Sequence, residues 1–221
     1  LQRLADAGLL TGPSLSWPIA WSQVARELGR ADLAALRDGD RVAVERLRTR
    51  AAREMRTDDI RFEATLSGSA DPTPLRGFES IPREEGEARL AADWTGQRFA
   101  WKLAATVVAD PDDDQTVRPD GSYVAMSLGN WMVSAGYLDR WWGPGWEGSL
   151  ILGTNHRPIP SFTIERNVSD PFESRWLAWI GQWRLAMTYG LLDGQREDHP
   201  DAHFFGMRIT WKPHDRVEIG L

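Results

Sequence analysis

The segment from Gly136 to Pro160 combines two kinds of side chain that suit carbohydrate recognition. Tryptophan offers a flat apolar face on which a pyranose ring can stack, and arginine can make paired hydrogen bonds to a uronate or pyruvate carboxylate. Gly143, Pro144 and Gly145 force a tight, irregular bend beside these side chains. The pattern predicts a polysaccharide-binding site made by Asp139, Arg140, Trp141, Trp142, Trp146, Glu147 and Arg157.

A purely structural role for the same residues stays open. Trp141 and Trp142 could plug the inside of the fold, and Arg140 could pair with Glu147 or Glu165 simply to hold the bend. Two prolines close to Arg157 favour a fixed turn over a ligand site. The sequence does not decide between packing and sugar contact.

A glycoside hydrolase would need a pair of carboxylates on either side of the scissile bond. Asp139, Glu147 and Glu165 are candidates, but nothing in their spacing fixes the distance between any two of them. The sequence contains none of the phosphate-binding, dinucleotide-binding, nucleophile-elbow or zinc-protease motifs. We therefore expect a protein without catalytic residues.

Two clusters resemble metal sites without meeting their requirements. His199 and His203 stand four positions apart, but Pro200 between them prevents the helix that would bring both rings to one metal ion. The acidic run 110–114 lacks the spaced glycine and distal glutamate of an EF-hand loop. No metal and no cofactor are expected.

Composition excludes several classes of protein. The 221 residues carry a net charge of −6, which disfavours nucleic-acid partners, and the absence of cysteine excludes disulfides and thiolate chemistry. No apolar run of about 18 residues predicts a transmembrane helix, and no secretory signal is present. Because the chain begins at Leu1 and not at methionine, we expect that residues before it have been removed or not recorded. The 12 tryptophans suit both sugar-binding faces and membrane interfaces.

Residues 1–57 predict a small helical subdomain. The first helix closes at Gly12, the second begins with Ser22 as its cap, and the third places Val44, Leu47, Ala51 and Met55 on one face. The arginines of this third helix alternate with glutamates, which favours a solvated face over a site for nucleic acid or lipid headgroups.

Residues 58–221 change to the period-two alternation of antiparallel strands, of which we count about eleven. The apolar positions include Ile60, Phe62, Ala64 and Leu66, then Phe99, Trp101, Leu103, Ala105 and Val107, then Trp183, Leu185, Met187 and Tyr189, then Phe205, Met207, Ile209 and Trp211, and finally Val217, Ile219 and Leu221. Long connections are predicted at 68–87, 109–121, 138–148, 167–175 and 193–201, alternating with short turns near 95, 129, 154, 181 and 212. Strict alternation would put every long connection at one end of the strands.

This arrangement is typical of an antiparallel transmembrane β-barrel, although a soluble sandwich gives similar alternation. Aromatic residues near strand ends favour the barrel, because such residues form girdles at the membrane surface: Trp94, Trp101, Trp131, Trp176, Tyr189, Phe205 and Trp211. The chain stops within a strand. A spanning sheet must close in lipid, so a barrel requires further strands after Leu221 and is incomplete in this chain.

Three segments resemble the Wzi family of capsule assembly proteins: GNWMVSAGYLDRWWGPGWEGSLILGTNHRPIPSFTIER at 129–166, LSWPIAW at 15–21 and FGMRITWKP at 205–213. The resemblance extends over nearly the whole chain. It implies an outer-membrane β-barrel with a helical bundle at its periplasmic N-terminus, acting as a lectin that fixes capsular polysaccharide to the cell surface. This chain would then contain the helical part and somewhat more than half of the barrel.

The expected function is therefore a non-enzymatic, lectin-like protein in contact with outer-membrane lipid that binds capsular or extracellular polysaccharide. Two alternatives remain. A porin-like channel is possible because the predicted lumen carries Arg61, Glu63, Lys102, Arg184 and Arg208. An envelope polysaccharide hydrolase is the third hypothesis.

Overall fold

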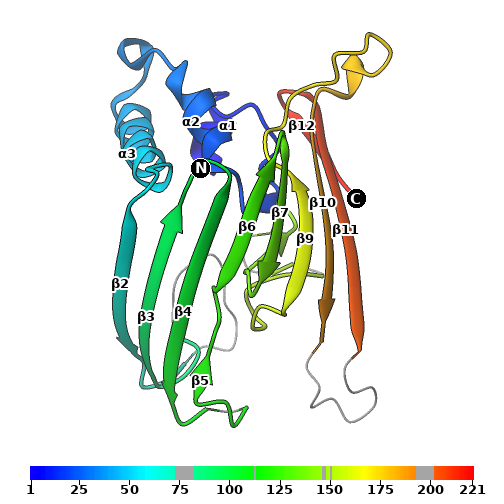
Figure 1. Ribbon diagram of the computed structural model, residues 1–221. Coiled ribbons are helices and arrows are strands. Elements are labelled where there is room, and N and C mark those ends of the chain that lie inside the picture. Colours follow the sequence, from blue (N-terminus) through cyan, green and yellow to red (C-terminus); the bar gives the residue numbers. More distant parts are fainter. Residues whose placement is uncertain (73–81, 112, 146–147, 150, 193–201) are drawn as a thin grey trace.

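The computed structural model describes residues 1–72, 82–111, 113–145, 148–149, 151–192 and 202–221. Its main element is a curved antiparallel sheet, called the wall, in which the strands follow the order β12-β11-β10-β9-β7-β6-β4-β3-β2 and β5 pairs with β4 (Figure 1). The strands are β2 (Ile60–Gly68), β3 (Gly86–Thr95), β4 (Phe99–Ala109), β5 (Val117–Arg118), β6 (Tyr123–Leu128), β7 (Trp131–Gly136), β9 (Ser161–Arg166), β10 (Gln182–Leu191), β11 (His203–His214) and β12 (Val217–Gly220). Strands β1 (Ser16–Trp17) and β8 (Trp141–Trp142) form a separate pair.

Helices gather at one end of the wall, called the helix end (Figure 1). They are α1 (Gln2–Asp6), α2 (Trp21–Gly29) and α3 (Asp38–Glu54), with the short 3₁₀ helix η1 (Leu33–Ala35) between the last two. The core between them is apolar and consists of Leu4, Leu10, Val24, Leu28 and Val44. Among the described residues, no helix is both long and apolar enough to cross a membrane.

Three details of the helical prediction are wrong. Helix α1 ends at Asp6 and does not continue to Gly12. Helix α2 begins at Trp21 after Ala20, without a side-chain cap, so Ser22 is not its capping residue. Met55 follows the end of α3 and is exposed, whereas Val44 and Ala51 on the predicted face are buried. The α3 face therefore contacts the other helices over a shorter length than its apolar spacing predicted.

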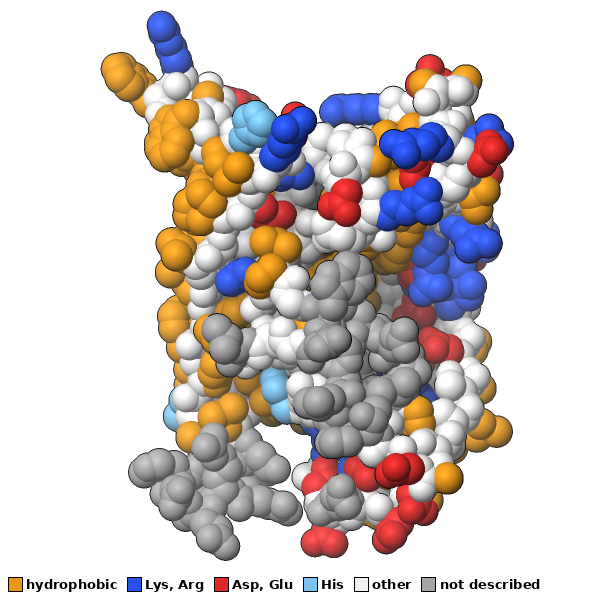
Figure 2. All heavy atoms as spheres, turned by 180° about the vertical axis from the view of Figure 1, so that it is seen from behind, with side chains coloured by type: hydrophobic (Ala, Val, Ile, Leu, Met, Phe, Trp, Pro, Cys, Tyr) orange, Lys and Arg blue, Asp and Glu red, His pale blue; other side chains and the backbone are white. Residues whose placement is uncertain are grey.

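The wall reverses the usual distribution of side chains. Its large apolar residues point outward and stay exposed, for example Phe62 at 81% and Leu66 at 85%. Most of the buried positions of the opposite face are polar, and Ala91, Ala104, Val108 and Ala186 are buried among them. The polar ones include Thr106, Ser134, Thr163, Arg184, Thr188 and Thr210. Seen from behind, hydrophobic side chains follow the left margin, and charged and other polar side chains lie between the margins (Figure 2). An apolar exterior around a polar interior is the arrangement of a barrel wall in lipid.

Connections of the wall do not alternate strictly in length, so that prediction is wrong at two places. Long connections 69–85, 110–122, 137–160 and 192–202 lie at the end opposite the helices, but 167–181 is long and lies at the helix end. The predicted connection to 148 and turn near 154 imply a strand between them, but the described residues 151–154 form none. Leu152 shows why the pattern misled, because it packs on Trp142 and not in the sheet.

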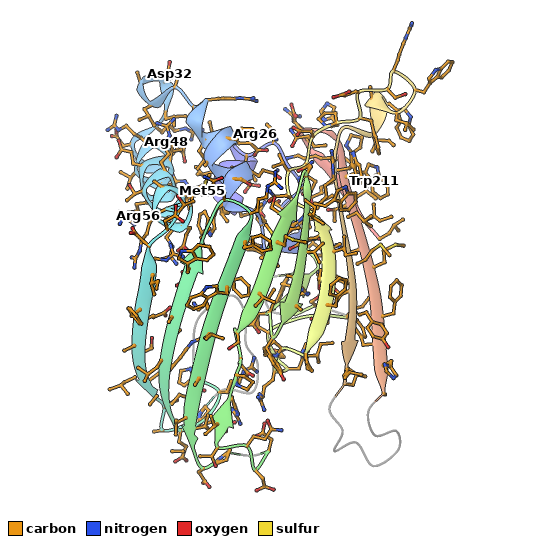
Figure 3. All side chains as sticks on the ribbon, viewed as in Figure 1. Arg26, Asp32, Arg48, Met55, Arg56 and Trp211 are labelled. Atoms are coloured by element: carbon orange, nitrogen blue, oxygen red, sulfur yellow. The ribbon has the colours of Figure 1, made fainter. Side chains whose placement is uncertain are left out.

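Tryptophans form an outward row near the helix end of the wall. Cross-strand register pairs Trp94 with Trp101 and Trp183 with Trp211, and Trp131 begins β7. Figure 3 places Trp211 at this level. At the other end, Tyr189 pairs with Phe205. Aromatic rows at both ends of an apolar band are what a membrane girdle requires.

The sheet does not close, because β2 and β12 form its two edges. The chain thus has the antiparallel β-barrel architecture predicted from the sequence, with the barrel incomplete.

Candidate functional site

The connection 137–160, here called the inner strap, crosses the polar inner face of the wall. It leaves the wall at Gly136 and returns at Ser161, two residues that face each other in the sheet register. Gly136 has φ 144°, and a Cβ atom there would lie 2.2 Å from the carbonyl oxygen of Ser122. Only glycine fits this position. Within the strap, β8 pairs with β1 of the N-terminal segment through Trp142 opposite Ser16.

The two strap tryptophans with defined positions are buried. Trp141 is 1% exposed, and its indole Nε1 donates to the carbonyl of Gly145 at 2.9 Å. Trp142 packs with Leu152 of the strap and Ala186 of β10. Both rings therefore stabilise the strap in this conformation and offer no free face to a sugar. This is what the packing interpretation of the sequence predicts.

Arg140 belongs to the strap and is only 6% exposed, with its side chain directed to the wall. Its Nη2 donates to Thr163 Oγ1 at 2.6 Å, and Thr163 is 3.0 Å from Thr188 Oγ1. Burial lowers the pKa of the Arg140 guanidinium, and the charge of Glu165 opposes that shift. Glu165 does not pair with Arg140 directly, because its carboxylate accepts from Arg184 at 2.9 Å.

Arg184 and Glu218 attach the N-terminal segment to the wall. Arg184, on β10, donates to the carbonyl oxygens of Ser16, at 3.1 Å, and Pro18. The Glu218 carboxylate on β12 accepts from the backbone N–H groups of Ser14 and Leu15, each at 2.9 Å. The segment that pairs with the strap is thus fixed by two wall strands.

Arg157 fixes the other part of the strap at the end of the wall opposite the helices. It donates twice to Asp120, at 2.9 Å from Nε and from Nη2, and its Nη1 donates to Asp113 at 2.8 Å and Gln115 at 2.7 Å. The hydrogen bond to Asp120 raises the pKa of Arg157 despite partial burial. Arg157 thus connects the strap to the connection 110–122.

Asp113 joins two arginines into one network. It accepts from Arg157 and, at 2.8 Å, from Arg118, whose other carboxylate partner is Glu84 at 2.7 Å. Burial alone would raise the pKa of Asp113, but the hydrogen bonds from Arg118 and Arg157 outweigh it and lower the pKa to about 2. Nearby, Arg83 donates to the carbonyl oxygens of three successive strap residues, 154–156.

The structure therefore divides the predicted site. Arg140, Trp141 and Trp142 are successive buried residues of the strap, Arg157 lies at its far end in the ion-pair network, and Asp139 is exposed. Trp146 and Glu147 fall outside the described residues, as do His199 and Pro200. Among the positions that are described, no cluster of three metal-ligating side chains occurs.

A cavity of about 390 Å³ lies between the strap and the N-terminal segment. Its lining is mostly apolar and comprises Leu1, Gln2, Ser14, Leu15, Trp17, Gly143, Pro144 and Gly145. Trp17 lines this cavity but is not among the site residues that the sequence predicts. Only the β1–β8 pairing, which joins residues far apart in the chain, brings Trp17 to the strap.

A family model described as capsule assembly protein Wzi matches residues 57–221, about three quarters of the chain. The chain belongs to the Wzi capsule assembly family. A solved Wzi structure from Escherichia coli matches with a TM-score of 0.87 and 26% identity, over 98% of this chain and 48% of that one. That protein is described as an outer-membrane protein involved in group 1 capsule assembly and as a carbohydrate-binding β-barrel.

A second relative is an uncharacterised 55.8 kDa protein in the cps region of Klebsiella pneumoniae. It is 27% identical over 220 residues, which are 98% of this chain and 42% of the relative. The chain thus spans less than half the length of either Wzi relative. The family model begins at residue 57, but both relatives match 98% of this chain. The similarity therefore includes the helical subdomain.

Proposed function

We propose that this chain is part of an outer-membrane lectin that binds capsular polysaccharide and helps to attach the capsule to the bacterial surface. Wzi family membership supports this proposal, together with the carbohydrate binding described for the E. coli relative. The observation that carries it here is a wall with a lipid-compatible exterior, whose polar interior holds a firmly attached strap. In this proposal the helical subdomain lies in the periplasm.

The sugar-binding surface in this proposal is the accessible side of the strap, with Asp139 and the unplaced Trp146 and Glu147 among its contacts. The cavity beside Trp17 has the volume of an ordinary ligand site and combines an indole ring with the polar groups of Gln2 and Ser14. Arg140, Trp141, Trp142 and Arg157 then hold this surface in place. Direct contact of the buried Arg140, Trp141 and Trp142 with polysaccharide requires the strap to move.

A porin-like channel is the second candidate, because the inner face of the wall is polar. The strap occupies part of that inner face and is held at both ends, which argues against an open lumen. Single-channel recordings of the full-length protein in planar bilayers test this alternative. Steady conductance with the strap intact would favour the channel.

Hydrolysis has less support, and we propose that the protein binds polysaccharide without cleaving it. The Glu165 carboxylate makes an ion pair with Arg184 at 2.9 Å and is therefore engaged within the wall, not placed beside a second carboxylate on either side of a sugar. Release of new reducing ends from capsular polysaccharide by the purified protein would contradict this proposal.

The proposal is tested by measuring capsular polysaccharide on cells and in the medium, in a strain lacking the full-length gene and in its parent. We expect normal total polysaccharide with a larger share in the medium. An unchanged cell-bound share would refute the attachment function.

Binding by the purified full-length protein then tests the surface. We expect Trp17→Ala and Gln2→Ala to weaken binding of capsular polysaccharide, because both side chains line the cavity. Trp131→Ala is the matched control, since its ring lies on the outer face of the wall. Equal binding by all three variants would exclude the cavity as the sugar site while leaving the attachment function intact.

A further inference from the structure

The connection 167–181 at the helix end differs from the tight turns beside it, because it projects from the wall (Figure 1). Its base is firmly fixed. The amide of Asn130 donates to the carbonyl of Val168 at 2.8 Å, and the backbone N–H of Val168 donates back to that side chain at the same distance. Asp170 makes an ion pair with Arg26 of α2 at 2.8 Å.

The base also rests on the tryptophan row of the wall. Phe172 stacks on Trp183 with ring centroids 4.5 Å apart, and the guanidinium of Arg166 lies 3.9 Å above the centroid of the same indole. The tip carries the 3₁₀ helix η2 (Ala178–Ile180), which contacts β11. The projection therefore begins at the level of the girdle and continues beyond it.

The tip, residues 173–180, exposes two large aromatic side chains on this rigid mount. Trp176 is 86% exposed and Trp179 is 69% exposed, with Leu177 between them and Arg175 before them. Backbone hydrogen bonds order the tip, including Leu177 N–H to the Ser174 carbonyl at 3.0 Å and Ile180 N–H to the Leu177 carbonyl at 3.1 Å. A turn that holds two indoles in water, without packing them on the protein, indicates a contact outside the described chain.

We propose that the tip is an interfacial anchor, which inserts Trp176 and Trp179 into the phospholipid headgroup layer on the helix side of the membrane. Two observations favour lipid as the occupant. The apolar exterior continues without a break along the margin of the wall up to this tip (Figure 2). Tryptophan with a neighbouring arginine is also the combination suited to the headgroup level, where an apolar ring and a polar N–H are both satisfied.

The anchor acts independently of polysaccharide binding. Its base contacts α2 through Arg26 and Gln23, whose side-chain oxygen accepts from the Ser169 backbone N–H at 3.1 Å. A tip held in the headgroup layer would therefore fix the height of the helical subdomain relative to the membrane.

Quenching of tryptophan fluorescence tests the anchor in the full-length protein, reconstituted in nanodiscs of phosphatidylethanolamine and phosphatidylglycerol. The difference in emission between the wild type and the double variant Trp176→Phe/Trp179→Phe is the emission of these two indoles. Phenylalanine is chosen because it keeps the tip apolar. We expect that emission to be quenched by lipids brominated near the glycerol backbone, to the same extent as the emission lost in Trp131→Phe. Iodide in the water should quench it weakly.

Two results would overturn the anchor. Strong quenching by iodide with none by brominated lipid would place both indoles in water. Quenching by neither agent, as expected for the buried Trp141 in a Trp141→Phe reference, would show that another part of the full-length protein covers the tip.

Discussion

The helical subdomain and the wall bury opposite kinds of side chain. In the helices, Leu4, Leu28 and Val44 are buried and arginines cover the surface, whereas in the wall Leu66 and Phe62 are exposed and threonines and arginines are buried. The apolar spacing in each part is regular. The difference shows that periodicity marks the two faces of an element but not which face meets the protein interior; the surrounding solvent decides that.

The largest expected effect concerns Arg184, a charged residue buried on the inner face of the wall. Arg184→Met should cost about 3–5 kcal/mol of unfolding free energy, because it leaves the Glu165 carboxylate without its ion-pair partner. Denaturant titration of the full-length protein in lipid vesicles measures the change. Arg216→Met, at an exposed turn, is the control and should stay within about 0.5 kcal/mol of the wild type. Equal stability of both variants would show that the ion pair between Arg184 and Glu165 adds nothing to the free energy of unfolding.

Two leucine truncations compare the two regions directly. Leu28→Ala should cost about 2–5 kcal/mol, because Leu28 is fully buried in the helical core and its removal leaves a cavity. Leu66→Ala should cost less, because its side chain is 85% exposed and leaves no cavity in the protein. Protease resistance of the helical subdomain and denaturant titration of the barrel would measure the two losses separately. A larger loss for Leu66→Ala would mean that the outer face packs against protein.

A charge placed on each exposed surface sharpens the same comparison. Leu103 lies near the middle of β4 and points outward, so Leu103→Arg should cost about 2–4 kcal/mol in a bilayer. Val42→Arg on α3 is the matched substitution at an exposed apolar residue in water, and should change stability by less than about 0.5 kcal/mol. If Leu103→Arg were also neutral in vesicles, the outward face of the wall would not contact lipid.

The smallest effect is expected in the ion-pair network of Arg157. The folded-state pKa of Asp113, about 2, lies below its ordinary value of 3.8. Its stabilising contribution is therefore complete above that ordinary value and disappears as pH falls through about 2. Asp113→Asn should be less stable than wild type at about pH 5 and equally stable near pH 2. A stability difference that does not change with pH would assign the effect to lost packing.

Much of the architecture was predictable because alternation is local. The helical pattern up to residue 57 and the alternation in segments such as 183–189 and 205–211 follow from neighbouring residues, whereas the pairing of Trp183 with Trp211 is seen only in the structure. The inner strap was not predictable in the same way. Leu152 looked like part of a strand, and only the tertiary contact with Trp142 explains its apolar character.

The sequence predicted which segment contains the candidate site, but not which of its side chains are accessible or what they contact. The sequence identified the bend and its arginines, yet the burial of Trp142 depends on packing against Ala186 of β10. The partners of Arg157 were equally hidden, since Asp120 and Asp113 belong to another connection. Whether these residues contact polysaccharide stays a prediction.

The attachment of the N-terminal segment to β12 has a consequence for the order of folding. The hydrogen bond from Ser14 to Glu218 joins residues 204 positions apart. Strand β1 can pair with β8 only after the strap has taken its place across the inner face of the wall. Closing so long a loop costs conformational entropy that is recovered only after the intervening strands have paired. Residues 14–17 should therefore be among the last to acquire native contacts, although Leu4 and Leu10 join the local helical core, and the strap should stay mobile until they do.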